Sequence, residues 1–234
     1  MKFTTAVNTI RERLEDHVPK RLSIDSFIPA AVTIPIFEKN GKPHMLLTLR
    51  ADTVEHHKGQ VSFPGGAWEP HDTSIEQTAL RETDEEVGIP PSMTRVIGQL
   101  DDFPTISDFI ITPFVTTIPY PFPTDVNPDE VAKLLEVPFD LFLTDSHFEA
   151  KIKRYKNTEY PVYYYYFEDT IIWGITGFII NRFVEMTFGY NPAPQSISAD
   201  PRIPDYLRDN VIKLGIRNQE SKRTENHKES KKTS

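Results

Sequence analysis

The chain has 234 residues, 38% of them hydrophobic and 26% charged, a composition typical of one globular domain with additions. The formal net charge of −8 argues against a broad nucleic-acid interface, which needs a basic surface. There is no apolar run of the roughly 18 residues that a membrane span needs, no secretory signal in MKFTTAVNTIRERLEDHV and no cysteine, so we expect a cytoplasmic protein without disulfides.

The chain begins with a predicted helix and a predicted β-hairpin. Residues 3–18 place apolar side chains at helical spacing, and we expect this N-terminal segment, residues 1–27, to pack on the main domain. Residues 30–37 and 44–50 have the composition of strands. Asn40-Gly41 lies between them and predicts the tight turn of a hairpin.

A glycine turn and a second helix follow. Residues 60–63 resume an extended pattern, which Pro64-Gly65-Gly66 then breaks, because paired glycines adopt backbone conformations closed to other residues. Thr73 and Glu76 match a capping box, which predicts a helix from about residue 74 to residue 87.

The second half of the chain alternates predicted strands with loops. Four stretches have the β-branched and aromatic composition of strands: residues 94–100, 109–118, 148–155 and 160–167. Pro113 predicts a bulge or an edge, and residues 130–137 fit either a strand or a helix. In the run 163–166, alternate tyrosine rings are expected to face the core and the outside.

The last predicted helix lies within residues 171–188 and begins near Gly174. It contains Asn181, Arg182 and Glu185, so it is predicted to be a buried helix and not a membrane span. Residues 190–234 are predicted to be a largely irregular or disordered extension. The order of elements predicts an α/β (α+β) protein with a mixed sheet covered by helices.

The predicted helix at 74–87 carries the most informative side chains. Glu82, Glu85 and Glu86 lie at i, i+3 and i+4, which places three carboxylates on one face. Charge runs of this kind are most often solvated surface. The alternative is an oxygen-ligand site for Mg²⁺ or Mn²⁺, which the preceding glycine turn favours, because it lets the backbone approach a phosphorylated ligand closely.

These residues carry a family resemblance. Arg81 to Gly88, RETDEEVG, resembles the Arg-Glu-x-x-Glu-Glu-x-Gly core of the Nudix hydrolases. Asp72 stands near the position of the first glutamate of that motif, and the spacing from Gly66 to Arg81 is one residue longer than the general pattern. The longer spacing, together with LLTLR at 46–50 and HKGQVSFPGG at 57–66, is similar to the coenzyme A diphosphatase branch.

The resemblance implies a Nudix α/β/α sandwich over residues 28–189 and hydrolysis that depends on Mg²⁺ or Mn²⁺. It implies Glu82 and Glu86 as metal ligands and Glu85 as a third ligand or the general base. Arg81 is expected to pair with a carboxylate and hold its orientation. Glu82, Glu85 and Arg81 are therefore the candidate catalytic residues.

Five further residues are candidates for contact with substrate: Arg50, His57, Lys58, Gly65 and Gly66. A strand-end arginine, a loop histidine and an exposed lysine are about as often structural, and the glycines serve the turn. For Glu130 and Glu136 we favour an exposed carboxylate over a role in the site.

Three functions are carried forward. The first is cleavage of the diphosphate bond of coenzyme A into 4′-phosphopantetheine and adenosine 3′,5′-bisphosphate. The second is hydrolysis of another nucleoside diphosphate derivative, such as ADP-ribose, NADH or a nucleotide sugar. The third is a binding module without catalysis, which the three intact glutamates argue against. The expected partner is a small molecule, with no nucleic acid and no membrane, and a homodimer stays open.

Overall fold

The structure is a computed structural model that describes residues 1–51, 59–123, 125–155 and 158–192. His57 and Lys58, and most of the extension predicted at 190–234, lie outside the described residues. The elements that follow belong to one compact unit, Met1–Lys151 with Val162–Ile197. Of the described residues, only the ends of two strands, within Ile152–Pro161, belong to a second unit.

The described residues form helices α1 (Phe3–Glu15), α2 (Ile75–Val87) and α3 (Gly174–Phe188), with 3₁₀ turns η1 (Pro91–Met93), η2 (Phe139–Leu143) and η3 (Asp145–His147). The strands are β1 (Ile28–Lys39), β2 (Lys42–Arg50), β3 (Val61–Ser62), β4 (Gly65–Ala67), β5 (Arg95–Gln99), β6 (Phe103–Pro104), β7 (Phe109–Thr117), β8 (Val131–Pro138), β9 (Phe148–Tyr155), β10 (Thr158–Phe167) and β11 (Thr170–Ile172).

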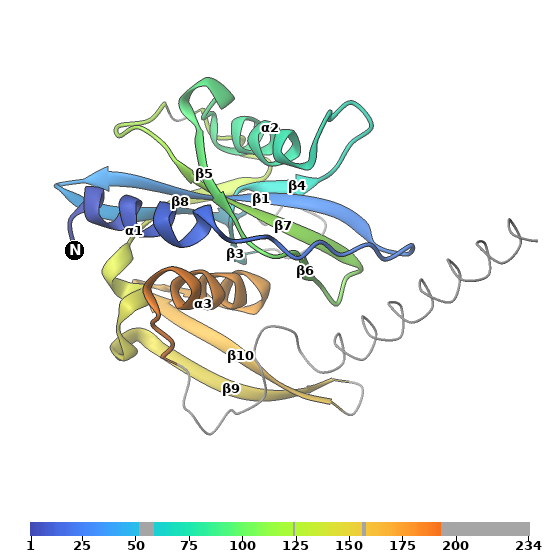
Figure 1. The fold of residues 1–234 in the computed structure, drawn as a ribbon. Helices are drawn as coiled ribbons and strands as arrows, with labels where there is room; N and C mark the ends of the chain where they lie inside the picture. Colours follow the sequence, from blue (N-terminus) through green and yellow to red (C-terminus); the bar gives the residue numbers. More distant parts are fainter. Residues whose placement is uncertain (52–58, 124, 156–157, 193–234) are drawn as a thin grey trace, which may run out of the picture. The chain divides into compact units, whose positions relative to one another are not determined.

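Strand β1 is the centre of a mixed sheet with the order β3-β2-β1-β7-β5 (Figure 1). It runs parallel to β7 from Ile28 to Ile36. Along its other edge it pairs first with the short strand β4 and then, from Ile36 onward, with β2. Along the edge that first pairs with β1, strand β2 then pairs with β3, while β8 pairs along its other edge from His44 to Arg50. The glycine turn is therefore part of the sheet itself.

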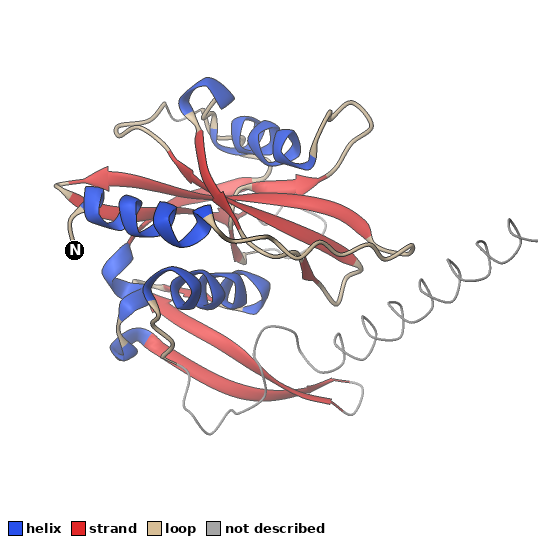
Figure 2. Cartoon of the chain, in the orientation of Figure 1, coloured by secondary structure: helices blue, strands red, loops and turns tan. Residues whose placement is uncertain are grey.

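Both faces of the sheet are covered by helices (Figure 2). Side chains alternate along a strand, so Ile34 and Ile36 face one side of β1, where they join the main core with side chains of α1 and α3. Ala31 and Thr33 face the other side, where α2 packs. The expected α/β/α sandwich with a mixed sheet is confirmed.

The predicted single sheet is wrong in one respect, because β9, β10 and β11 form a separate three-stranded sheet. The tyrosine run alternates as expected: Tyr163 and Tyr165 are buried, and Tyr166 is exposed. The ambiguous residues 130–137 belong to strand β8. Within the part of the chain that the structure describes, no helix is long and apolar enough to cross a membrane.

Three local predictions need correction. Helix α1 ends at Glu15, and Val18 is 85% exposed. The cap of α2 is shifted by one residue, because the Ser74 hydroxyl accepts the bond from the Gln77 amide. Pro113, expected at a bulge or an edge, lies inside β7. This strand pairs with β1 on one side and with β5 and then β6 on the other, and Pro113 lies where β5 ends and β6 begins.

Candidate functional site

The site begins at the glycine turn, where each glycine is required for a different reason. A Cβ on Gly65 would lie 2.3 Å from the carbonyl oxygen of Ala31, so only glycine lets β4 pair with β1. A Cβ on Gly66 would lie 2.4 to 2.6 Å from the carboxyl group of Glu82. Gly66 therefore provides the space into which helix α2 projects this carboxylate.

Glu86 is the most buried of the three glutamates on α2 and is 2% exposed. Its Oε2 accepts the amide of Gly65 at 3.3 Å, and its Oε1 lies 3.6 Å from Nη1 of Arg50. Burial raises the pKa of Glu86 to about 8, although the charge of Arg50 acts in the opposite direction. The fold thus holds an acidic group where its negative charge is only partly compensated.

Glu82 lies one turn earlier on the same face of α2. Burial raises its pKa too, against the favourable charge of Arg81. The negative charge of Glu130 acts on both Glu82 and Glu86 in the same direction. Two carboxylates therefore lie at the glycine turn, and the charge of a third, from a separate segment, acts on both; a cation would relieve this repulsion between like charges.

Arg81 was expected to pair with a carboxylate and hold its orientation. It pairs with three carboxylates, and Asp72 accepts two of its hydrogen bonds. Its Nε and Nη2 donate to the two oxygens of Asp72 at 2.9 and 3.0 Å, while Nη1 donates to Glu82 at 2.9 Å and Glu85 at 2.8 Å. Hydrogen bonds from Arg81, the Glu69 amide and the Thr78 hydroxyl keep the pKa of Asp72 well below its ordinary value.

The ion pairs of Arg81 bear on whether the carboxylates already form a metal-binding site. Among the residues that the structure describes, no three His, Asp or Glu side chains gather closely enough to form a ready-made metal site. Glu82 and Glu85 are drawn toward Arg81, and Glu85 is largely exposed. To bind one cation together with Glu86, both side chains would have to turn away from the guanidinium.

The residues nevertheless fit a hard divalent cation. Mg²⁺ and Mn²⁺ prefer carboxylate oxygens, and Glu86 supplies a buried carboxylate whose pKa is raised, mainly by burial. Glu82 lies beside it at the same turn, and Glu85 follows on the exposed rim of the helix. These three side chains would hold the ion.

The structure brings together most of the site residues that the sequence pointed to. Arg50, Gly65, Gly66, Glu82 and Glu86 meet at one place. Glu136 does not belong there, because it pairs with Lys39 at 2.5 Å, as expected for a surface carboxylate.

Two residues of the site were missed or undervalued. Asp72, which the sequence places only near the first glutamate of the motif, is buried and anchors Arg81; that place was the available signal. Glu130, expected to be exposed, is half-buried, and its charge acts on Glu82 and Glu86. The bond from the Ala51 amide to the Glu130 carbonyl joins these distant segments, and the sequence carries no signal of it.

Comparisons with known proteins identify the family of the chain. The NUDIX domain model matches residues 27–157, more than half of the chain. An uncharacterized Nudix hydrolase NudL from Photorhabdus laumondii subsp. laumondii is 41% identical over 167 residues, which cover 71% of this chain and 88% of the relative. A NudL from Yersinia pestis (strain Pestoides F) is 40% identical over 156 residues, 67% of this chain and 78% of the relative.

The chain therefore belongs to the Nudix hydrolase family. Among solved structures, the Nudix hydrolase RenU from M. smegmatis is 25% identical, with a TM-score of 0.42, over 48% of this chain and 71% of that chain. The MutT protein from Methanosarcina mazei Go1 is 22% identical, with a TM-score of 0.41, over 52% and 84% of the two chains.

Proposed function

We propose that this protein cleaves the diphosphate bond of coenzyme A or its derivatives, giving 4′-phosphopantetheine and adenosine 3′,5′-bisphosphate, with Mg²⁺ or Mn²⁺ as cofactor. The observation that carries the hydrolytic part is the buried carboxylate of Glu86, held at the glycine turn beside Glu82 and facing Arg50. The choice of coenzyme A is supported by the motifs at 46–50 and 57–66 and by the longer spacing before Arg81.

Each side chain has a proposed role. Glu82, Glu86 and Glu85 hold the cation, which when bound neutralises phosphate oxygens and lowers the pKa of water. Glu85 is also the candidate base, because it is the most accessible of the three carboxylates. Arg81 positions Glu82 and Glu85 through its bonds to both.

Arg50 is proposed to bind a phosphate of the substrate. It ends strand β2 directly beside the buried Glu86, and its Nε is buried with no hydrogen-bond partner among the described residues. An arginine N–H without a partner is well suited to an incoming phosphate oxygen. His57 and Lys58 remain proposed contacts to the substrate.

The boundaries of the protein's parts are also proposals. Residues 28–189 would form the hydrolase domain, and residues 1–27, which include the packed helix α1, an N-terminal addition to it. Residues 190–234 would be an extension without a catalytic role. The protein is proposed to act in the cytoplasm on a small molecule, alone or as a homodimer.

A substrate panel tests the proposal. The purified protein is incubated with Mg²⁺ or Mn²⁺ and with coenzyme A, acyl-coenzyme A, ADP-ribose or NADH, and products are separated by chromatography. We expect 4′-phosphopantetheine and adenosine 3′,5′-bisphosphate from coenzyme A. Efficient cleavage of ADP-ribose or NADH with coenzyme A left intact would reject coenzyme A as the substrate. The proposed hydrolase activity would still stand.

A matched pair of variants tests the role of Glu86. Glu86→Gln removes the negative charge and keeps the shape, and we expect turnover to fall by about a hundredfold or more, as for loss of a metal ligand or its support. Asp84→Asn removes one charge from an exposed position on the same helix and should keep turnover near that of the wild type. Equal activities of the two variants would reject the metal-ligand assignment.

A further inference from the structure

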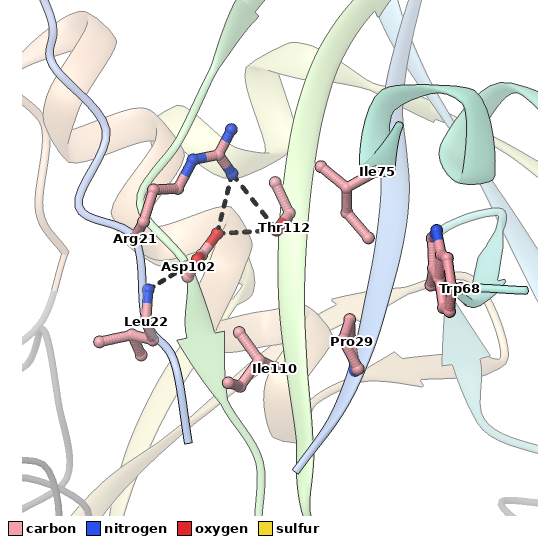
Figure 3. A pocket seen from close by; sticks show the side chains of 8 residues that line it. All are labelled: Arg21, Leu22, Pro29, Trp68, Ile75, Asp102, Ile110 and Thr112. Atoms are coloured by element: carbon pink, nitrogen blue, oxygen red, sulfur yellow. Dashed lines mark hydrogen bonds and ion pairs between the residues drawn. The ribbon is translucent and has the colours of Figure 1, made fainter. Parts of the chain in front are cut away.

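Among the described residues, no helix covers one end of the large sheet. Helix α2 begins at Ile75 and covers Ala31 and Phe114. Pro29 and Ile110 lie on the same face but beyond the start of the helix. Together with Ile75 they form the apolar floor of an open pocket of about 590 Å³ (Figure 3).

One wall of the pocket is Trp68, which follows directly after β4. Its amide donates to the carbonyl of Pro29 at 2.9 Å, and its indole Nε1 donates to the carbonyl of Asp72 at 3.3 Å. The side chain is nevertheless 40% exposed. A tryptophan fixed at both ends and open to solvent presents a rigid flat surface, which stacks well on another planar group.

The opposite wall is polar and carries the ion pair of Arg21 with Asp102 (Figure 3). Asp102 is buried and accepts bonds from the Leu22 amide at 2.9 Å and the Thr112 hydroxyl at 2.7 Å. It also binds Nη1 of Arg21 at 3.2 Å. The Arg21 side chain is 49% exposed, and a guanidinium has five N–H donors, of which Nη1 donates to Asp102 and Thr112; the other nitrogens can donate to a ligand.

The pocket adjoins the carboxylate site along strand β4. Gly66 faces the carboxyl group of Glu82, and Trp68, two residues later, faces the same side because side chains alternate along a strand. Two residues of a strand span about 7 Å. Gly66 at the carboxylate site and Trp68 at the pocket are therefore about 7 Å apart along the chain, a distance within the length of a nucleotide.

We propose that this pocket binds the nucleotide end of the substrate, with the purine base stacked on Trp68 and a phosphate on Arg21. The inference rests on the proposed function, since it takes adenosine 3′,5′-bisphosphate as the part of coenzyme A that carries a base and an additional phosphate. The pantetheine arm has no planar ring to match Trp68 and no anionic group remote from the diphosphate to match Arg21.

Fluorescence tests the binding without catalysis. The chain has two tryptophans, at positions 68 and 173, so in a Trp173→Phe background the emission comes from Trp68 alone. We expect saturable quenching on titration with adenosine 3′,5′-bisphosphate in EDTA, at least about fivefold weaker binding in Arg21→Gln, and no quenching by 4′-phosphopantetheine. Quenching by 4′-phosphopantetheine and not by the bisphosphate would overturn the proposal.

Kinetics give a second readout. Trp68→Ala should raise KM for coenzyme A about tenfold with little change in kcat, and Trp68→Phe should restore most of the loss. Trp173→Ala is the matched control, because Trp173 is 41% exposed and stacks on Tyr164 away from the lining of this pocket. It should keep the wild-type KM.

The two proposals fail in different ways. Coenzyme A cleavage with an unchanged KM in Trp68→Ala and no fluorescence response would reject the nucleotide pocket and leave the proposed function standing. Quenching by the bisphosphate in a protein that does not cleave coenzyme A would reject the proposed function and support the pocket as a nucleotide site.

Discussion

Replacing Glu86 by glutamine should make the metal-free protein more stable, although it removes activity. The pKa of the Glu86 carboxyl is raised from 4.5 to about 8 in the fold. Because the folded pKa is the higher one, the group costs nothing well below pH 4.5, and the cost grows as pH rises toward 8. It amounts to roughly 1 kcal/mol at pH 5 and roughly 3 kcal/mol at pH 7.

Glutamine keeps the shape and still accepts the Gly65 amide, so most of this cost should disappear. Urea unfolding in EDTA at the two pH values measures the free energy of unfolding of both proteins. We expect Glu86→Gln to exceed the wild type by up to about 3 kcal/mol at pH 7 and by about 1 kcal/mol at pH 5. A variant that is less stable than the wild type at both pH values would refute the reasoning.

Two further predictions concern the glycine turn and the anchor of Arg81. Gly66→Ala should keep the free energy of unfolding within about 1 kcal/mol, because only the flexible Glu82 carboxylate must move, yet lower kcat/KM at least about tenfold. Gly65→Ala should cost more than about 2 kcal/mol, because its Cβ meets the backbone of Ala31. Equal unfolding midpoints for the two variants would contradict this contrast. Asp72→Asn should cost about 3 kcal/mol at pH 7. Since the folded pKa of Asp72 is lowered, this stability is present above its unfolded value of 3.8 and is lost as pH falls below it. Unfolding at pH 7 and about pH 3 should show the difference from wild type shrinking; a constant difference would exclude the ion pair as its cause.

Features encoded by one or two adjacent residues were predictable. Asn40 and Gly41 both have positive φ, 54° and 76°, and close the expected hairpin. Gly88 ends α2 with φ 72°, and Gly174 begins α3. Each depends on a local preference that the residue type itself carries.

Features that depend on distant pairing were not predictable in the same way. The parallel ladder between β1 and β7 joins residues about 80 apart in the chain. The sequence of neither strand specifies which other strand it pairs with. The same limit hid the separate sheet β9-β10-β11. In the site, the helical spacing of Glu82 and Glu86 was readable, whereas the approach of Glu130 was not.

The place where α2 begins has a consequence for changes in chain length. Gly66 is fixed by the ladder with β1, and inserting a residue within α2 would rotate every later side chain by about 100°. The segment between Asp72 and Ile75 belongs to neither element. A residue added to this segment would leave the turns of α2 in register, so Glu82 and Glu86 would keep their common face. Related chains should therefore differ in length at this segment more readily than inside the helix.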